Sequence, residues 1–383
     1  MPIYFDNAAT TMVCREAADA AYNIMTENYG NPSSTHTMGR NARKALESAR
    51  EQLARALGAE PAEVFFTSCG TESDNWAILS GAELMKRRGN HVISSTVEHS
   101  AVLKALDALE AQGWEVTRLS PEKDGSISAQ SVLDALRPDT VLISLMMVNN
   151  ETGGITDISA ISKAVRRAGS GALIHCDAVQ GFMKLPFKAS TLGADMISVS
   201  GHKIHAPKGI GALYIKGGEK AIKLKPLIVG GSQESARRAG TEALPQIAAF
   251  GAAAELAKAK LDESQEHMKM LKARAIERLC SENEGLLVLS GDAPHILSIS
   301  LPGYKSEVLM NFLEKRDIFV SKSSACRKGK RSYVLEALGL SPDVIDGALR
   351  IGFSRYNTLE ELDALCNGIS DAKASLKTVL GHK

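Results

Sequence analysis

Short apolar runs alternate with amphipathic segments between about residue 63 and residue 215. The runs are VFFT (64–67), HVISS (91–95), EVTRL (115–119), VLISLMMV (141–148), LIHCD (173–177), DMISVS (195–200) and GALYI (211–215). The intervening stretches, such as ESDNWAILSGAELMKRR and DISAISKAVRRA, carry apolar residues at helical spacing. Repetition of strand and helix predicts an α/β fold with a largely parallel sheet covered on both faces.

The pattern changes after about Leu244. A helical stretch rich in Ala, Lys and Glu runs from Pro245 to about Leu279, and HILSISL, a helix over 306–316, IFVS, ALRIGFS and a closing helix near 358–376 follow it. This second set predicts a smaller α+β domain joined by the amino-terminal dozen residues. We expect a large domain of residues 13–255 and a small domain of residues 1–12 and 256–383.

Composition and charge favour a small-molecule substrate or a local protein contact. The 383 residues are 44% hydrophobic, and 45 Lys and Arg against 44 Asp and Glu leave a net charge of +1, which gives no long-range attraction to nucleic acid or to an anionic membrane. The longest apolar run, 141–148, is far shorter than the roughly 20 residues that span a bilayer. The start MPIYFDNAATT lacks the features of a signal peptide, so a cytoplasmic protein is expected.

The six cysteines, at positions 14, 69, 176, 280, 326 and 366, form no CxxC pair. Their scatter suits neither a zinc site nor a disulfide framework, and most are expected to be small core residues. The His-Cys-Asp triplet at 175–177 is a poor metal site because adjacent strand residues point to opposite faces. No metal is predicted.

Polar motifs follow the apolar runs, and in parallel sheets ligands bind beyond the carboxyl ends of the strands. One of them, TSCGTES (67–73), joins a strand to a helix through Gly70 and could cradle a phosphate, although helix capping alone explains it as well. Lys203 in SGHK could form a Schiff base or be a solvated lysine. Asp177 could keep a pyridine nitrogen protonated, and Gln180 could bond a ring oxygen.

The order and spacing of these motifs along the chain make the functional interpretation specific. The stretches DNAATT, YGNPSSTH, FTSCGTESDN, VEHSAV, NNETG, DAVQ, SGHKIHAPKGIGALYI, RRAGT and SSAC resemble the cysteine desulfurases of the NifS/IscS type, from Tyr4 to about Arg355. The resemblance implies the aspartate aminotransferase fold (type I) of class V aminotransferases, pyridoxal 5′-phosphate as cofactor in the large domain, and a homodimer.

The resemblance also implies residue roles. Lys203 would carry the cofactor, His99 would stack on its ring, Asp177 would pair with the ring nitrogen and Gln180 would bond the phenolic oxygen. The phosphate would be bound by Gly70, Thr71, Ser200 and His202, with Thr241 reaching over from the other subunit. Asn150, which also belongs to the cofactor site, and Arg350 would hold the substrate carboxylate. Taken singly, each of these residues has an ordinary structural alternative.

Cys326 in SSAC, on a loop of the small domain, is the expected sulfur carrier. Attack on sulfur requires thiolate, which nearby cations favour, and five cations without an acid lie between positions 322 and 331: Lys322, Arg327, Lys328, Lys330 and Arg331. The implied transferase reaction converts L-cysteine to L-alanine and leaves a persulfide on Cys326. The sulfur would pass to an acceptor protein, such as an iron–sulfur cluster assembly scaffold or a tRNA-thiolation protein.

The sequence departs from the family pattern at one place, and it leaves three alternative functions open. Many relatives have small and acidic residues where this chain has RKGKR, which puts the identity of the acceptor in doubt. A selenocysteine lyase would depend less on Cys326, and another aminotransferase-family enzyme would not use it. A non-catalytic partner protein would not need Lys203, Asp177 and His99. Cys69 is interpreted as structural.

Overall fold

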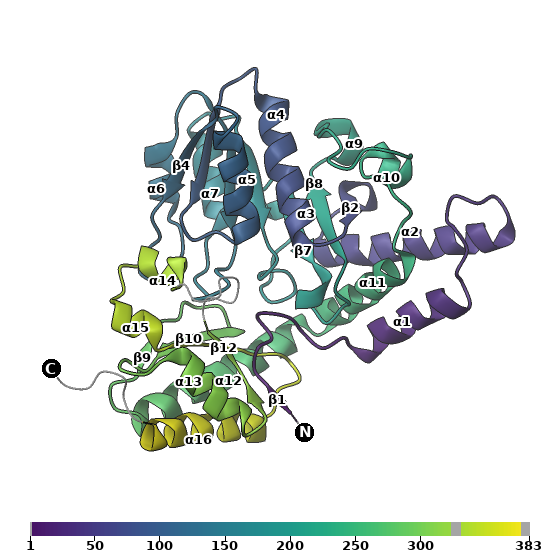
Figure 1. The fold of residues 1–383 in the computed structure, drawn as a ribbon. Coiled ribbons are helices and arrows are strands. Elements are labelled where there is room, and N and C mark those ends of the chain that lie inside the picture. The colour runs from purple at the N-terminus through teal and green to yellow at the C-terminus, as the bar shows by residue number, and fades with distance from the viewer. Residues whose placement is uncertain (1, 323–330, 377–383) are drawn as a thin grey trace.

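A seven-stranded sheet forms the centre of the larger part of the molecule (Figure 1). The computed structural model describes residues 2–322 and 331–376, apart from the side chains of Glu219 and Lys220. The strand order is β2-β8-β7-β6-β5-β3-β4. Only β8 runs antiparallel to its neighbours in this sheet, which confirms the largely parallel arrangement. The strands are β2 (Val64–Thr67), β3 (His91–Ser95), β4 (Glu115–Leu119), β5 (Thr140–Met146), β6 (Leu173–Asp177), β7 (Met196–Ser200) and β8 (Gly211–Ile215).

Helices cover both faces of this sheet because its central strands are apolar on both sides. Val92 and Leu142 belong to one hydrophobic cluster, whereas the next residues along each strand, Ile93 and Ile143, belong to another. That alternation is the two-residue period of a strand. The helices nearest the sheet are α2 (Thr37–Leu57), α7 (Ile158–Arg167) and α11 (Leu244–Ala259) on one side, and α3 (Gly70–Asn75), α4 (Gly81–Met85) and α5 (Ser100–Glu110) on the other.

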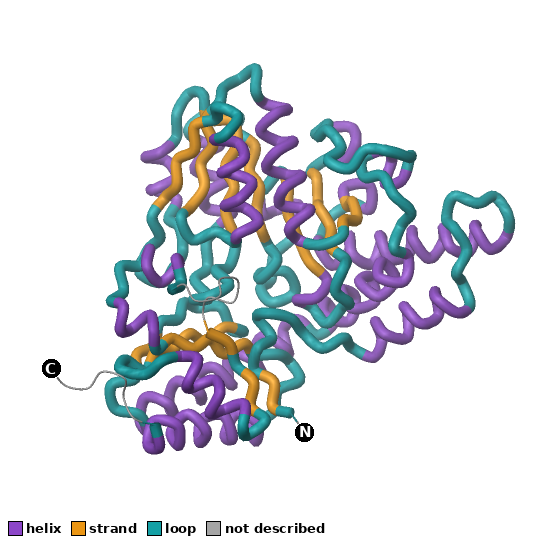
Figure 2. Tube along the Cα trace, viewed as in Figure 1, coloured by secondary structure: helices purple, strands orange, loops and turns teal. Residues whose placement is uncertain are grey.

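A smaller sheet of order β12-β13-β10-β9 lies below, covered by three helices (Figure 2). Its strands are β9 (Leu287–Val288), β10 (Ile296–Ser300), β12 (Ser321–Lys322) and β13 (Ala348–Gly352), and its helices are α12 (Leu261–Glu282), α13 (Ser306–Glu314) and α16 (Leu359–Ser375). The amino terminus joins this part, because β1 (Ile3–Tyr4) pairs in parallel with β11 (Ile318–Phe319) and Phe5 belongs to its core. The division of the chain at residues 255 and 256 stays a prediction.

The remaining elements refine the sequence-based assignment. They are α1 (Arg15–Thr26), α6 (Ala129–Ala135), α8 (Ala189–Leu192), α9 (Gly218–Ala221), α10 (Gln233–Ala236), α14 (Tyr333–Ala337), α15 (Pro342–Asp346), a π-helical turn (Trp76–Ser80) and two 3₁₀ turns (Pro61–Glu63 and Gly201–Lys203). The single helical stretch expected from Pro245 to Leu279 is two helices, since Lys260 has φ −112° and ψ 16°. None of the helices in residues 2–322 and 331–376 combines the length and the apolar character needed to cross a membrane.

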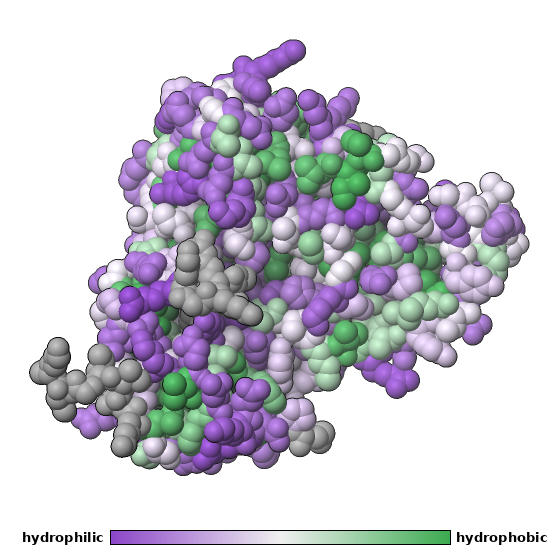
Figure 3. Space-filling view, in the orientation of Figure 1, coloured by the Kyte–Doolittle hydropathy of each residue, from purple (hydrophilic) through white to green (hydrophobic). Residues whose placement is uncertain are grey.

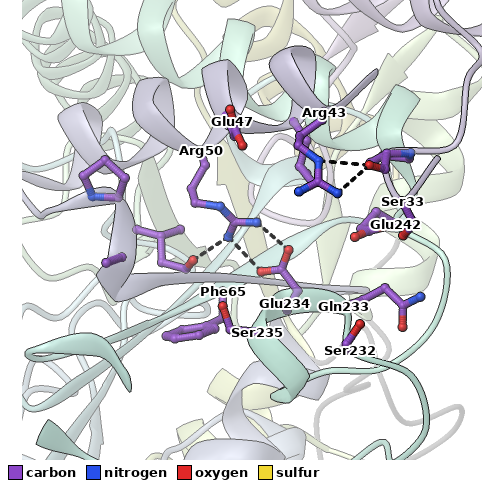
Figure 4. A pocket seen from close by; sticks show the side chains of 15 residues that line it. Ser33, Arg43, Glu47, Arg50, Phe65, Ser232, Gln233, Glu234, Ser235 and Glu242 are labelled. Atoms are coloured by element: carbon purple, nitrogen blue, oxygen red, sulfur yellow. Dashed lines mark hydrogen bonds and ion pairs between the residues drawn. The ribbon is translucent and has the colours of Figure 1, made fainter. Parts of the chain in front are cut away.

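A partly buried ion pair holds the segment around α10 against α2. Arg50 Nη2 lies 2.5 Å from Glu234 Oε1, and Glu234 Oε2 accepts a hydrogen bond of 2.8 Å from the backbone N–H of Phe66. Glu234 and the next two residues have φ of 46°, 56° and 60°, a region that L-residues rarely adopt. Arg50, Glu234 and Ser235 line a cavity of about 420 Å³, into which the Arg50–Glu234 pair projects (Figure 4). The pair therefore stabilises a strained turn that leads directly to Thr241.

Candidate functional site

A second cavity, of about 480 Å³, lies where the carboxyl ends of β5, β6 and β7 meet the smaller sheet. Segments from Ala8 to Arg350 contribute to it, so the site depends on contacts that are distant in the sequence. Ten of the predicted site residues line it: Gly70, Thr71, His99, Asn150, Asp177, Gln180, Ser200, His202, Lys203 and Arg350. The structure therefore brings together residues that the sequence distributes over 281 positions, from 70 to 350.

The start of α3 forms a cradle with room for a phosphate. A methyl group at Gly70 would lie 2.8 Å from Val179 Cγ2, so only glycine leaves this space open. Ser200, at the end of β7, is 2% exposed, and its buried Oγ has no hydrogen-bond partner. Free N–H groups at a helix start and an unpartnered hydroxyl together suit an anionic oxygen.

Asp177, at the end of β6, interacts electrostatically with His99. Asp177 Oδ1 accepts a hydrogen bond of 2.9 Å from the backbone N–H of Val179. Burial raises the pKa of Asp177, whereas His99 and Lys203 oppose the rise. A cationic ring nitrogen placed against Asp177 would favour the carboxylate form.

The imidazole of His99 is fixed by its position before α5. Its Nδ1 accepts a hydrogen bond of 3.2 Å from the backbone N–H of Ala101, which places the proton of the neutral ring on Nε2. Burial lowers the pKa of His99, so the neutral ring is favoured. A neutral, oriented ring is suited to stacking on a flat aromatic ligand.

Lys203 ends a short turn after β7 and reaches the amino-terminal segment. Its Nζ donates to the carbonyls of Ala8 and Ala9 at 2.6 and 2.7 Å. Gln180 uses one amide N–H on the same Ala8 carbonyl, at 2.8 Å, which leaves its second N–H for a ligand oxygen. Burial and the Lys203 charge lower the pKa of His202 to about 4, so His202 is neutral at pH 7.

Arg350 and Asn150 also line the cavity. Arg350 is 2% exposed, and its Nη1 donates to the backbone carbonyl of Asn150 at 2.8 Å. The buried Nε of Arg350 and the Oδ1 of Asn150 have no hydrogen-bond partner. Unsatisfied polar atoms of this kind mark a place for a polar ligand group, and a guanidinium suits a carboxylate.

Thr241, a further predicted residue, is exposed and is not among the residues that line the cavity. Cys326 lies within residues 323–330, outside the described part of the chain. Of the five cations around it, Lys322 pairs with Glu307 at 2.9 Å and Arg331 pairs with Asp346 at 2.8 Å, so these two charges are partly compensated. Arg327, Lys328 and Lys330 lie outside the described residues.

Sequence reasoning missed several acids in and beside this site, and three of them adjoin residues already discussed. Asp6 Oδ1 lies 3.2 Å from Arg350 Nη2, and Glu151 is buried in the cavity wall beside Asn150. Glu98, next to His99, is fully buried, and burial raises its pKa to about 8. All three acids lie in motifs that were singled out, DNAATT, NNETG and VEHS, but only the fold shows what they contact.

Comparison with known proteins places this geometry in a family. Residues 3–365 match the family described as Aminotransferase class-V. The chain belongs to this family. It is 40% identical to "Cysteine desulfurase IscS" of Methanosarcina thermophila over 383 residues, which cover 98% of this chain and 93% of the relative.

Two solved structures are similar to this chain over nearly its full length. A "NifS-like protein" superposes with a TM-score of 0.92 at 35% identity and covers 98% of this chain and 100% of its own. A structure titled "SspA in complex with cysteine" has a TM-score of 0.79 at 33% identity, covering 93% and 99% of the two chains. These likenesses bear out the NifS/IscS resemblance and the fold that it implied.

Class V aminotransferases use pyridoxal 5′-phosphate, and this cavity fits the cofactor. The open space at Gly70 and the unpartnered Ser200 Oγ suit its phosphate, Asp177 suits its ring nitrogen and Lys203 suits its aldehyde carbon. Among the described residues, no group of three or more His, Cys, Asp or Glu side chains is placed to hold a metal ion.

Proposed function

We propose that this protein is a cysteine desulfurase that converts L-cysteine to L-alanine and transfers the sulfur atom to Cys326 as a persulfide. The observation that carries the proposal is the convergence of Lys203, Asp177 and Arg350 on one cavity, in a chain with about 40% identity to desulfurases. The likeness to a structure solved with cysteine supports the choice of substrate.

The residues of the cavity divide the work of binding and of proton transfer. Arg350 and Asn150 hold the substrate carboxylate, and this fixes the α-carbon on the side of Lys203. When bound, pyridoxal phosphate supplies an electron sink for the pair left by the α-proton. Asp177 keeps the ring nitrogen protonated, and the neutral Lys203 amine takes the α-proton. Lys203 is well placed to do so because the carbonyls of Ala8 and Ala9 hold its Nζ in the cavity.

The sulfur transfer itself requires a second thiolate. The Cys326 thiolate forms a sulfur–sulfur bond with the substrate thiol, the carbon–sulfur bond breaks, and its electron pair goes to the carbon side, which becomes the methyl group of alanine after protonation. The products are alanine and a persulfide on Cys326. Transfer of the terminal sulfur to an acceptor protein, such as an iron–sulfur scaffold or a tRNA-thiolation protein, then regenerates the thiol.

The proposal includes a homodimer. Thr241 is exposed on its own subunit, in agreement with a phosphate contact in the partner's site. Exposed hydrophobic side chains on and near α1, namely Met12, Tyr22, Met25 and Tyr29, support a contact surface there, and hydrophobic patches interrupt the hydrophilic face beside this helix (Figure 3).

Substitution of Cys326 by alanine tests the proposal. The variant, loaded with pyridoxal phosphate, should lose sulfide release from cysteine and retain the cofactor absorbance near 400 nm. Activity that survives on selenocysteine alone agrees with the proposal, since the selenium substrate depends less on the loop thiol. Undiminished sulfide release from cysteine contradicts the role of Cys326.

A further inference from the structure

Glu151 is a buried acid in the wall of the candidate active site. It is 3% exposed, and the hydroxyl of Ser332 donates a hydrogen bond to its Oε2. Its backbone N–H donates to Asn149 Oδ1 at 2.9 Å, so the turn after β5 fixes its position. Ser332 comes from the segment that leads into α14, 181 residues further along the chain. Glu151 therefore lies where the two parts of the molecule meet, next to the residue that binds the substrate carboxylate.

The positive charge of Arg350 favours the ionised form of Glu151. Arg350 and Ser332 are the two groups that stabilise the ionised form of Glu151. However, Arg350 already pairs with Asp6 at 3.2 Å, and the substrate brings a further carboxylate to the same guanidinium. One cation would then interact with three carboxylates if Glu151 were ionised, and like charges repel strongly in a buried site.

Other charged and titratable groups also line the described part of the cavity. They lie on β6, in or just before α3 and α5, on the turn after β7 and on α14, and acids and bases are both present among them. They are Cys69, Asp74, His99, Lys104, Asp177, His202, Lys203 and Tyr333. Within residues 2–322 and 331–376, Arg350 is the cation that counteracts the rise in the pKa of Glu151. A proton on Glu151 is the direct way to remove the excess negative charge.

We propose that Glu151 is a positioning residue of the carboxylate subsite, which takes up one proton when the substrate carboxylate binds Arg350. This inference rests on the proposed role of Arg350. The neutral carboxylic acid keeps its contact with Ser332, removes the repulsion and leaves the guanidinium to the substrate. Glu151 thereby makes substrate binding depend on pH without touching the reacting atoms.

The titration range of Glu151 is suited to this role. Burial raises the pKa of Glu151 to about 7, although Ser332 and Arg350 act against the rise. A bound carboxylate raises it further. Above pH 7 the free protein must take up a proton to bind, so the dissociation constant rises about tenfold for each pH unit. Below about pH 6 the acid is already protonated, and binding is independent of pH.

Calorimetry on the pyridoxal-phosphate-loaded protein tests the proposal with 3-mercaptopropionate as the probe. This molecule has the carboxylate and thiol of cysteine but no amine, so its binding does not depend on the reaction. Titrations at pH 8 in buffers of different ionisation enthalpy give the number of protons taken up. We expect nearly one proton for the wild-type protein and none for Glu151→Gln, which should bind the probe about tenfold more tightly at pH 8.

Three further measurements distinguish proton uptake by Glu151 from uptake by other groups. Ser332→Ala removes a hydrogen bond that favours the ionised form, so the pH at which binding weakens should move upward. Glu336→Gln removes an exposed carboxylate on α14 and should leave proton uptake unchanged. The amide 3-mercaptopropionamide, which has no carboxylate, should bind without proton uptake.

Proton uptake that persists unchanged in Glu151→Gln would overturn the proposal, as would the absence of proton uptake in the wild-type protein or of probe binding at pH 6. The desulfurase function is tested separately, by sulfide release from the Cys326→Ala protein. If that test failed while proton uptake disappeared in Glu151→Gln, the carboxylate subsite would stand and the sulfur carrier would be wrong.

Discussion

Asp6 and Arg350 form an ion pair of 3.2 Å between the amino-terminal segment and β13. The two side chains are 344 residues apart in the sequence, and backbone pairing of Asp6 with Gly352 brings them together. The guanidinium is fixed from one side by Asp6 and from another by the carbonyl of Asn150, while its Nε stays unpartnered. Arg350 is therefore oriented before the substrate arrives.

Asp6→Asn should weaken substrate binding. The amide cannot form the ion pair, so Arg350 loses its orientation, and we expect KM for cysteine to rise about tenfold, the effect of one lost charged hydrogen bond. The kcat should change little, because Asp6 does not contact the reacting atoms. Steady-state kinetics with Asp19→Asn, an exposed acid on α1, as the control measure both constants. A fall in kcat with an unchanged KM would show that Asp6 has a different role.

Ser200→Ala should lower cofactor affinity without destabilising the cofactor-free protein. The Ser200 hydroxyl is buried and has no partner in the protein, so its removal breaks no internal hydrogen bond. The affinity for pyridoxal phosphate should fall about tenfold, since a hydrogen bond to a charged phosphate is lost. Titration followed by absorbance gives the affinity, and thermal unfolding gives the stability.

Ser298→Ala is the matched control for this experiment. Ser298 Oγ is also buried and unpartnered, but Ser298 lies on β10 and does not line the cavity. Its removal should leave cofactor affinity unchanged. Equal losses of affinity in the two variants would argue against a phosphate site at Ser200.

Arg50→Met should destabilise the protein. Removal of the arginine leaves the Glu234 carboxylate buried without its cation, which costs about 3 kcal/mol in the free energy of unfolding. Combination with Glu234→Gln should recover part of that loss, because the charge left behind disappears. Denaturant unfolding measures the three variants, with Arg15→Gln in an exposed pair as the control. Additive losses in the double variant would mean that the pair is not coupled.

His175 should make the protein less stable in acid. Its two ring nitrogens contact the hydroxyls of Ser144 and Ser198 at 2.9 Å, and burial lowers its pKa to about 3. Only the unfolded chain binds a proton there between pH 6.5 and pH 3, so the stability falls with decreasing pH by up to about 1.4 kcal/mol per unit. His175→Asn should reduce this slope, as measured by unfolding at pH 4 to 7. An unchanged slope would assign the acid sensitivity to other histidines.

The sequence predicts the central strands well because their apolar runs are short and bounded by polar motifs. The runs at 64–67, 91–95, 115–119, 173–177 and 211–215 match β2, β3, β4, β6 and β8 to the residue. The break between α11 and α12 was missed, since the composition on the two sides of Lys260 is equally helical. Local pattern carries no information on where a continuous helix-forming stretch bends.

The candidate site is predicted only in part, for a related reason. Motifs at strand ends pointed to Asp177 and Lys203 because the carboxyl edge of a parallel sheet collects them. The contacts of Asp6 with Arg350 and of Ser332 with Glu151 join segments 344 and 181 residues apart, and neither acid has a local signature of its own. The contacts of these acids can be identified only from a structure that shows how the two sheets are arranged.

The proposed transfer of the substrate's sulfur atom to Cys326 can be followed on the protein itself. The measurement is mass spectrometry of the pyridoxal-phosphate-loaded protein after a single turnover with L-cysteine, without reductant and followed by proteolysis. We predict that the peptide with Cys326 gains the mass of one sulfur atom, removable by reductant, while one alanine forms per site. Alanine formation with an unmodified Cys326 peptide, or a sulfur atom on Cys69 instead, would contradict the account.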